Sequence, residues 1–174
     1  MSIARPFRAL VLGHAGTGRT HIMVDLINSA TWNKVIILTQ YPQHSLYQCI
    51  MSRENILLTD DIKDVPSWDV FNHSIGKEHS LLIVDVGAFD QWKQFEQFWI
   101  RSRMHGISVA VSSHTYLEVP KLFRNNSTHM FITTLLHRER KRIAKDHELD
   151  ELKDNVLIDI DGQDEALRIR SLQK

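Results

Sequence analysis

A glycine-rich turn between an apolar segment and a helical segment constrains this chain more than any other feature. Its spacing is that of a phosphate-binding loop, G-x-x-x-x-G-K-[ST], with an arginine at the usual lysine position. Such a turn holds phosphate on successive backbone N–H groups and on the positive end of a helix dipole, and its glycines allow close approach. The predicted phosphate site consists of Gly13, His14, Ala15, Gly16, Thr17, Gly18, Arg19 and Thr20.

Two side chains of this loop have predicted roles toward a nucleotide. Arg19 is expected to reach the β- and γ-phosphates, and Thr20 to place its hydroxyl on Mg²⁺. Arginine is longer and more planar than lysine, although it carries the same charge. We therefore expect Arg19 to keep nucleotide binding and to change the geometry of hydrolysis.

Length and charge restrict the remaining possibilities. The 174 residues predict one domain spanning 1–174, and the net charge of zero excludes a global basic field. Any nucleic-acid contact must therefore come from a local patch. A single cysteine, Cys49, excludes an intramolecular disulfide and is typical of a reducing compartment. The N-terminal residues predict no signal peptide, and no apolar run is long enough to predict a membrane span.

Strand-like and helix-like segments alternate along the chain. This alternation predicts an α/β fold with a mainly parallel central sheet, helices on both faces and a C-terminal β-hairpin. Predicted strands are 7–12, 34–39, 56–58, 80–85, 107–112 and 130–133, with a hairpin from 156–160 and 166–169. Predicted helices are 20–30, 45–51, 91–104, 119–125 and 135–152, with a short helix and loop within 60–72.

The segment Leu81–Asp85 is four apolar residues followed by an acid. In an open α/β sheet the ligand lies at the carboxyl ends of the strands, so Asp85 is predicted to organise Mg²⁺ beside the phosphate loop. The alternative is a strand-end cap. Many ATPases place a second acid directly after this aspartate, but here Val86 follows, and Asp90 is better explained as a helix N-cap. The sequence therefore identifies no water-activating residue.

Two later segments carry a family resemblance. The first is RSRMHGISVAVSSH, residues 101–114, and the second is VPKLFRNN, residues 119–126. Together with the loop and Asp85, they resemble the viral genome-packaging ATPases of the FtsK–HerA superfamily, in its poxvirus-type branch. The resemblance implies a P-loop NTPase three-layer sandwich that binds ATP and Mg²⁺ and acts on double-stranded DNA. It further implies a homo-oligomeric ring, a hexamer or pentamer, at a viral capsid vertex, in the host cytoplasm or the virion.

The resemblance also implies roles for three residues. Arg124 is the first candidate for an arginine that reaches the nucleotide of a neighbouring subunit, and Arg103 is the second. A surface salt bridge is the alternative for each. His114 stands where the family commonly has a glutamine sensor, and it can contact a γ-phosphate or the attacking water, or be a turn histidine.

A basic cluster in the predicted C-terminal helix is the candidate DNA contact. Basic side chains there can bind phosphates along a ring channel, or form a solvated face with i,i+4 ion pairs. The cluster contains Arg138, Arg140, Lys141, Arg142 and Lys145.

Three functions remain open from the sequence. The preferred one is an ATP-driven DNA-packaging motor subunit. A small P-loop nucleotide or nucleoside kinase is the second, since the charged segment near Arg138 would suit a lid. The third is a nucleotide-binding assembly protein with weak or no hydrolysis, which Arg19 and Val86 favour.

Overall fold

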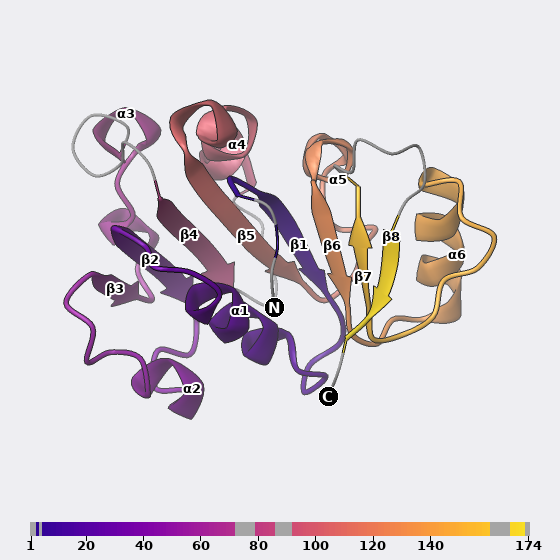
Figure 1. Ribbon diagram of the computed structural model, residues 1–174, viewed down its shortest axis with the longest axis horizontal. Helices are drawn as coiled ribbons and strands as arrows, with labels where there is room; N and C mark the ends of the chain where they lie inside the picture. Colours follow the sequence, from indigo (N-terminus) through magenta and orange to yellow (C-terminus); the bar gives the residue numbers. More distant parts are fainter. Residues whose placement is uncertain (1–2, 4, 72–78, 86–91, 161–167, 173–174) are drawn as a thin grey trace.

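Eight strands form one sheet in the order β3-β2-β4-β5-β1-β6-β7-β8 (Figure 1). The computed structural model describes residues 3, 5–71, 79–85, 92–160 and 168–172. Strands β1 to β6 pair in parallel, whereas β7 is antiparallel to both β6 and β8. The parallel sheet and the C-terminal hairpin are therefore confirmed. The strands are β1 (Arg8–Leu12), β2 (Lys34–Thr39), β3 (Ile56–Thr59), β4 (Ser80–Asp85), β5 (Ile107–Ser113), β6 (His129–Ile132), β7 (Val156–Asp159) and β8 (Arg168–Ser171).

Short helices connect the parallel strands. Among the described residues no helix is long and apolar enough to span a bilayer. The α-helices are α1 (Arg19–Asn28), α2 (Ser45–Gln48), α3 (Trp68–Val70), α4 (Trp92–Arg101), α5 (Lys121–Asn126) and α6 (His137–Asp146). Two 3₁₀ turns, η1 (Ile62–Asp64) and η3 (Ser102–His105), complete the described elements.

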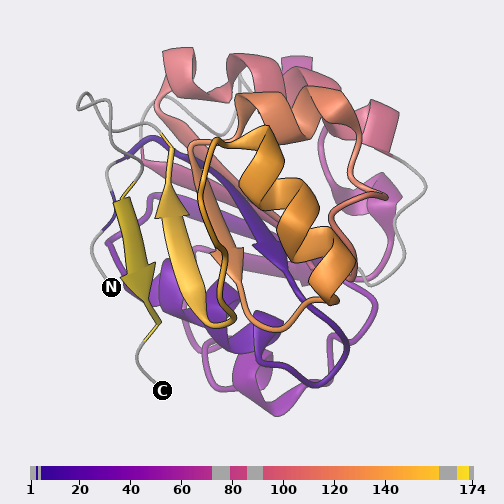
Figure 2. The ribbon, with the colours of Figure 1, turned by 90° about the vertical axis from the view of Figure 1, so that its right-hand side faces the viewer.

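The sheet separates two hydrophobic cores, because successive strand residues point to opposite faces. On β1, Leu10 and Leu12 belong to the core shared with α4, α5 and α6, whereas Val11 packs with α1. Figure 2 shows α4, α5 and α6 together over one face of the sheet. Helices therefore cover both faces, as the three-layer prediction requires.

The aromatic side chains of α4 lie in the core. Trp92, Phe95, Phe98 and Trp99 are all buried there. The α-helix ends at Arg101, earlier than predicted, and continues as the 3₁₀ turn η3. The predicted first residue, 91, lies outside the described residues.

The predicted helix over 135–152 is wrong at both ends, because α6 covers only His137–Asp146. At its start, Leu136 is extended and the Leu135 N–H donates to the Asp154 carboxylate at 3.2 Å. At its end, Glu148 has a φ of 55°, and the chain turns back. This reversal brings Leu152 into the core, which a continuous helix would not do.

Candidate nucleotide site

The glycine-rich loop joins the carboxyl end of β1 to the start of α1. Gly18 is the N-cap of α1 and has a φ of 98°, in the left-handed region that favours glycine. A Cβ at Gly13 would overlap the hydroxyl of Thr133, so the close passage of the chain beside β6 also requires glycine. The first N–H groups of α1 have no partner within the helix, and they make this end of α1 a site for an anion.

Hydrogen bonds within the fold fix the shape of the loop. Thr17 donates its hydroxyl proton to the His14 carbonyl at 2.7 Å. Its Oγ1 also lies 2.6 Å from Oγ1 of Thr133, and the Thr133 hydroxyl donates to the Leu12 carbonyl at 3.2 Å. The N–H groups of Gly13 and His14 donate to the carbonyls of Ser113 and Thr134 at 3.2 and 3.1 Å. Residues 13, 14 and 17 thus shape the loop rather than line the adjacent cavity.

Asp85 ends β4 and accepts three hydroxyl hydrogen bonds. Ser112 donates to Oδ1 at 2.7 Å, and Thr20 donates to Oδ2 at 3.0 Å. Tyr47, on α2, donates to the same Oδ2 at 2.6 Å. The side chains of β4, β5, α1 and α2 therefore converge on one carboxylate that is only 8% exposed.

Sequence reasoning did not identify Tyr47 as part of this site. It is fully buried on a helix of four residues, so its position in the sequence looks like that of any core aromatic residue. Burial, and next the charge of Asp85, raise the pKa of the Tyr47 hydroxyl above its ordinary value. Tyr47 therefore stays protonated and acts as a donor to Asp85.

A cavity of about 610 Å³ opens beside the loop. Its lining combines the start of α1, the segment after β2, Asp85 and the segment after β5. The lining residues are Ala15, Gly16, Gly18, Arg19, Thr20, His21, Gln40, Tyr41, His44, Asp85 and His114. Four predicted loop positions besides Thr20, together with Asp85 and His114, are thus brought together.

Arg19 provides the cationic side of this cavity. Its Nη1 is buried and has no hydrogen-bond partner among the described residues. Burial lowers the pKa of Arg19, whereas electrostatic interactions with Asp85 and next with Tyr47 raise it. Arginine remains protonated even when its pKa falls moderately, so Arg19 is a cation in the lining of the cavity. A phosphate oxygen is a suitable ligand for this guanidinium group.

His114 follows β5, lines the cavity and is half-buried. Partial burial, and next the charge of Arg19, lower the pKa of the imidazole below its ordinary value. The ring is therefore neutral at neutral pH and has one donor and one acceptor nitrogen.

Gln40 lies on the other side of Asp85 from His114. It follows Thr39, which pairs with Asp85 across β2 and β4, and its side chain lines the cavity. Nothing in the sequence distinguishes Gln40 from other polar residues after a strand. The parallel register places it at the cavity, and that register is a tertiary property.

The oxygen donors at this site suit a Mg²⁺ ion. Thr20 and Asp85 supply a hydroxyl and a carboxylate, and Mg²⁺ in phosphate sites is commonly held by one or two protein groups plus phosphate oxygens. The described parts of the chain contain no cluster of three or more metal-ligating side chains. The donor set therefore fits a cation shared with a bound phosphate.

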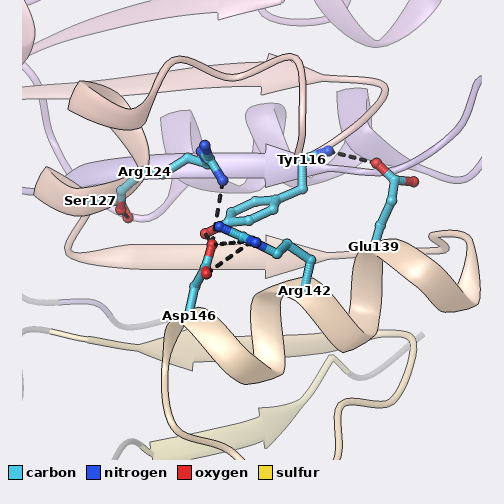
Figure 3. A network of polar contacts seen from close by, with 6 residues as sticks. All are labelled: Tyr116, Arg124, Ser127, Glu139, Arg142 and Asp146. Carbon is cyan, nitrogen blue, oxygen red and sulfur yellow. Dashed lines mark hydrogen bonds and ion pairs between the residues drawn. The ribbon is translucent and has the colours of Figure 1, made fainter.

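The two candidate arginines lie away from the cavity of their own subunit. Arg124 donates to Asp146 at 3.3 Å, and its guanidinium carbon lies 4.8 Å from the centre of the Tyr116 ring (Figure 3). Arg103 belongs to η3, which precedes β5, whereas the cavity lies beyond the carboxyl end of that strand. Neither residue lines the cavity within this chain.

The basic cluster of α6 is partly neutralised. Arg142 pairs with Asp146 at 3.0 Å, and Arg140 pairs with Asp154 at 2.9 Å. Three further members of the cluster are exposed. They are Arg138, Lys141 and Lys145.

No protein-family model and no curated protein sequence matches this chain. Solved structures do match it. The genome packaging NTPase B204 of Sulfolobus turreted icosahedral virus 2, in complex with sulfate, aligns with a TM-score of 0.66 at 13% identity, covering 99% of both chains. The same protein in complex with ATP-gammaS gives 0.63 at 12% identity, covering 97% of this chain and 98% of that one.

A secretion ATPase has the same architecture. The cytoplasmic domain of the type VII secretion ATPase EccC from Thermomonospora curvata aligns with a TM-score of 0.60 at 10% identity, covering 95% of this chain and 25% of that one. At these identities the likeness establishes the fold alone. The fold is that of P-loop ATPases, and the matching structures include a viral packaging ATPase, as the sequence resemblance implied.

Proposed function

We propose that this chain is an ATPase subunit of a viral DNA-packaging motor, hydrolysing ATP between subunits of a homo-oligomeric ring. The observation that carries the proposal is the cavity at the end of β1 and β4, which is lined by the phosphate-binding loop with Arg19 and by the buried carboxylate of Asp85. The fold shared with a packaging NTPase crystallised with ATP-gammaS supports the choice of nucleotide and of motor.

Different groups of the chain would bind the phosphates, stabilise the transferring charge and hold the cation during phosphoryl transfer. The loop N–H groups and Arg19 bind the phosphates, and Arg19 stabilises the charge that spreads over the transferring group. Thr20 and Asp85 would hold Mg²⁺, which supplies neutralisation of the phosphate charge. Together these groups account for binding and for electrostatic stabilisation.

Gln40 and His114 are the proposed partners of the attacking water. They line the cavity on the two sides of Asp85 and come from the strands that flank β4. A glutamine can orient a water by donating and accepting, and the neutral imidazole can do the same. The acid absent at Val86 is therefore replaced by two neutral polar side chains in this proposal.

Arg124 remains the proposed arginine supplied to a neighbouring subunit. In the single chain Asp146 and the Tyr116 ring hold it in place. Assembly would have to bring the surface that carries Arg124 toward the nucleotide cavity of the neighbouring subunit. A ring of identical subunits provides such a head-to-tail contact. Arg103 is the second candidate for the same role.

Double-stranded DNA is the proposed substrate that the motor translocates, and the exposed part of the α6 cluster is the proposed DNA-binding surface. Arg138, Lys141 and Lys145 would bind backbone phosphates, whereas Arg140 and Arg142 are already paired with acids. Phosphate contacts of this kind make affinity fall with salt. A viral capsid vertex is the proposed docking partner of the ring.

One set of assays tests this function. Nucleotide affinity, phosphate release and oligomeric state are measured with ATP and Mg²⁺, with and without double-stranded DNA. The proposal expects binding, turnover that DNA stimulates, and a ring formed with nucleotide. Binding without turnover would identify an assembly protein, and turnover that requires a small-molecule acceptor would identify a kinase; either result contradicts the motor.

Single substitutions at the cavity test the water-orienting pair. Gln40→Ala and His114→Ala should each lower turnover about 100-fold while nucleotide affinity stays within about threefold. Gln43→Ala is the matched control, because Gln43 is exposed on the same segment and does not line the cavity. Full turnover in both cavity variants would remove these residues from the mechanism.

A further inference from the structure

We propose that Tyr47 is a positioning residue for the bound cation, because its hydroxyl fixes the orientation of the Asp85 carboxylate and ties α2 to the metal site. The proposal rests on the nucleotide site described above and adds to it a residue outside the phosphate loop and the strand end.

Two donors on different oxygens define the plane of the Asp85 carboxylate. The terminal torsion of an aspartate is broad, so a carboxylate held by one contact can rotate. Ser112 holds Oδ1 at 2.7 Å and Tyr47 holds Oδ2 at 2.6 Å. Both hydroxyls come from buried residues and cannot exchange their bonds for water easily.

Thr20 cannot replace Tyr47 in this role. Its hydroxyl also donates to Oδ2, at the longer distance of 3.0 Å, and it lines the cavity where its oxygen is the expected cation ligand. Cation binding therefore changes the surroundings of Thr20, whereas Tyr47 is fully buried and does not line the cavity. Tyr47 and Ser112 remain as the constant partners of Asp85.

Tyr47 also connects the metal site to the wall of the cavity. The chain from Gln40 to His44 lies between β2 and α2 and contributes three lining residues. Gln48 donates to the Pro42 carbonyl at 2.7 Å, which ties this segment to α2. The Tyr47–Asp85 bond therefore holds α2 and the cavity wall against the carboxylate that receives the cation.

Tyr47→Phe removes the hydroxyl and keeps the ring in the core. The test measures the dissociation constant of a fluorescent ATP analogue, once with Mg²⁺ and once with EDTA. The Mg²⁺ ratio is the dissociation constant in EDTA divided by the dissociation constant with Mg²⁺. Loss of a group that orients a metal ligand costs about 10- to 100-fold in metal affinity, so the ratio should shrink by at least about tenfold. The affinity in EDTA should stay within about twofold of wild type.

Tyr116→Phe is the matched control. Tyr116 is also buried and also donates its hydroxyl to an aspartate, Asp146, at 3.1 Å. It does not line the cavity, so its loss should leave the Mg²⁺ ratio at the wild-type value. Thermal unfolding of both variants, without nucleotide, compares the structural cost of the two hydroxyls.

The outcomes separate this proposal from the proposed function. A wild-type ratio near one, or no nucleotide binding, would overturn the nucleotide site and Tyr47 with it. A clear wild-type ratio that Tyr47→Phe leaves unchanged would overturn the role of Tyr47 alone. If Tyr47→Phe weakens nucleotide affinity equally with Mg²⁺ and with EDTA, Tyr47 supports the fold rather than cation binding, which also overturns the proposal.

Discussion

Two buried tyrosines in this protein donate to aspartates, and the two pairs have different electrostatic surroundings. Tyr116 donates to Asp146, which also pairs with Arg124 at 3.3 Å and with Arg142 at 3.0 Å. Tyr47 donates to Asp85, whose hydrogen-bond partners among the described residues are three neutral hydroxyls. The first carboxylate forms ion pairs with two arginines, whereas the second lines a cavity that it shares with Arg19.

The difference identifies where the chain is built for a ligand. The network around Asp146 joins α5 and α6 through ion pairs and lies away from the cavity, although Nε of Arg124 is buried there without a hydrogen-bond partner among the described residues (Figure 3). Around Asp85, the carboxylate accepts only hydroxyl hydrogen bonds from the described residues, and Arg19 lines the same cavity. A divalent cation and an anionic phosphate together complement both groups.

The largest expected contrast comes from the two aspartates. Asp85→Asn should abolish Mg²⁺-dependent ATP turnover, because an amide replaces the carboxylate that would hold the cation. Asp146→Asn should keep nucleotide binding and cost about 1 kcal/mol of unfolding free energy. Turnover and thermal unfolding measure both effects. Retained turnover in Asp85→Asn, or loss of nucleotide binding in Asp146→Asn, would contradict the comparison.

Arg124 tests whether the network around Asp146 has a second use. If a neighbouring subunit uses this arginine, Arg124→Ala should lower turnover about 1000-fold while ATP affinity is retained. Arg101→Ala, at an exposed arginine of α4, is the control. Turnover is measured at concentrations where the ring is assembled. Unchanged turnover would leave Arg124 with only its salt bridge to Asp146.

Arg19 should behave as the opposite of Arg124, because Arg19 lines the cavity of its own chain and Arg124 does not. Arg19→Ala should weaken ATP binding about 10- to 100-fold, the cost of lost charge-assisted hydrogen bonds. Arg19→Lys should preserve binding, and its turnover shows whether the native arginine supports or limits hydrolysis. Titration calorimetry measures the affinities, with Arg53→Ala, away from the cavity, as control. Wild-type affinity in Arg19→Ala would contradict the account of the cavity.

The smallest effect is expected on α6, where only part of the basic cluster is free of ion pairs to acids. Replacing Arg138, Lys141 and Lys145 with glutamine, singly and together, should reduce the salt dependence of DNA binding by about one unit of slope per residue. Arg142→Gln should change it less, since Asp146 already pairs with that side chain. Fluorescence anisotropy at several salt concentrations measures the slopes. A slope unaffected by the triple substitution would exclude α6 as the DNA contact.

The sequence predicted the parts of the site that local patterns encode. The loop needs glycines at fixed spacing, and Asp85 ends an apolar strand, so both features can be recognised in the amino-acid sequence. Alternation of strands and helices predicted the layered fold and its hairpin in the same way. The overlong C-terminal helix was predicted because charged residues with high helix propensity continue past Asp146, whereas the core requires the chain to reverse there.

Tyr47 and Gln40 could not be predicted, because their roles depend on which strands are neighbours. Gln40 reaches the cavity only because β2 lies beside β4, in the register that pairs Thr39 with Asp85. Tyr47 reaches Asp85 only because α2 lies where its buried ring points at the end of β4. The pairing of Arg124 with Asp146 likewise joins α5 to α6 across 22 residues of sequence.

A crystal structure of the wild-type protein with ATP-gammaS and Mn²⁺ tests the central claim most directly, because anomalous scattering locates the cation independently of the nucleotide. The account predicts phosphate density against Arg19 and the loop N–H groups, with the cation at Thr20 and Asp85 and Tyr47 still bonded to Oδ2. Nucleotide bound elsewhere, or a cation away from Asp85, would contradict it.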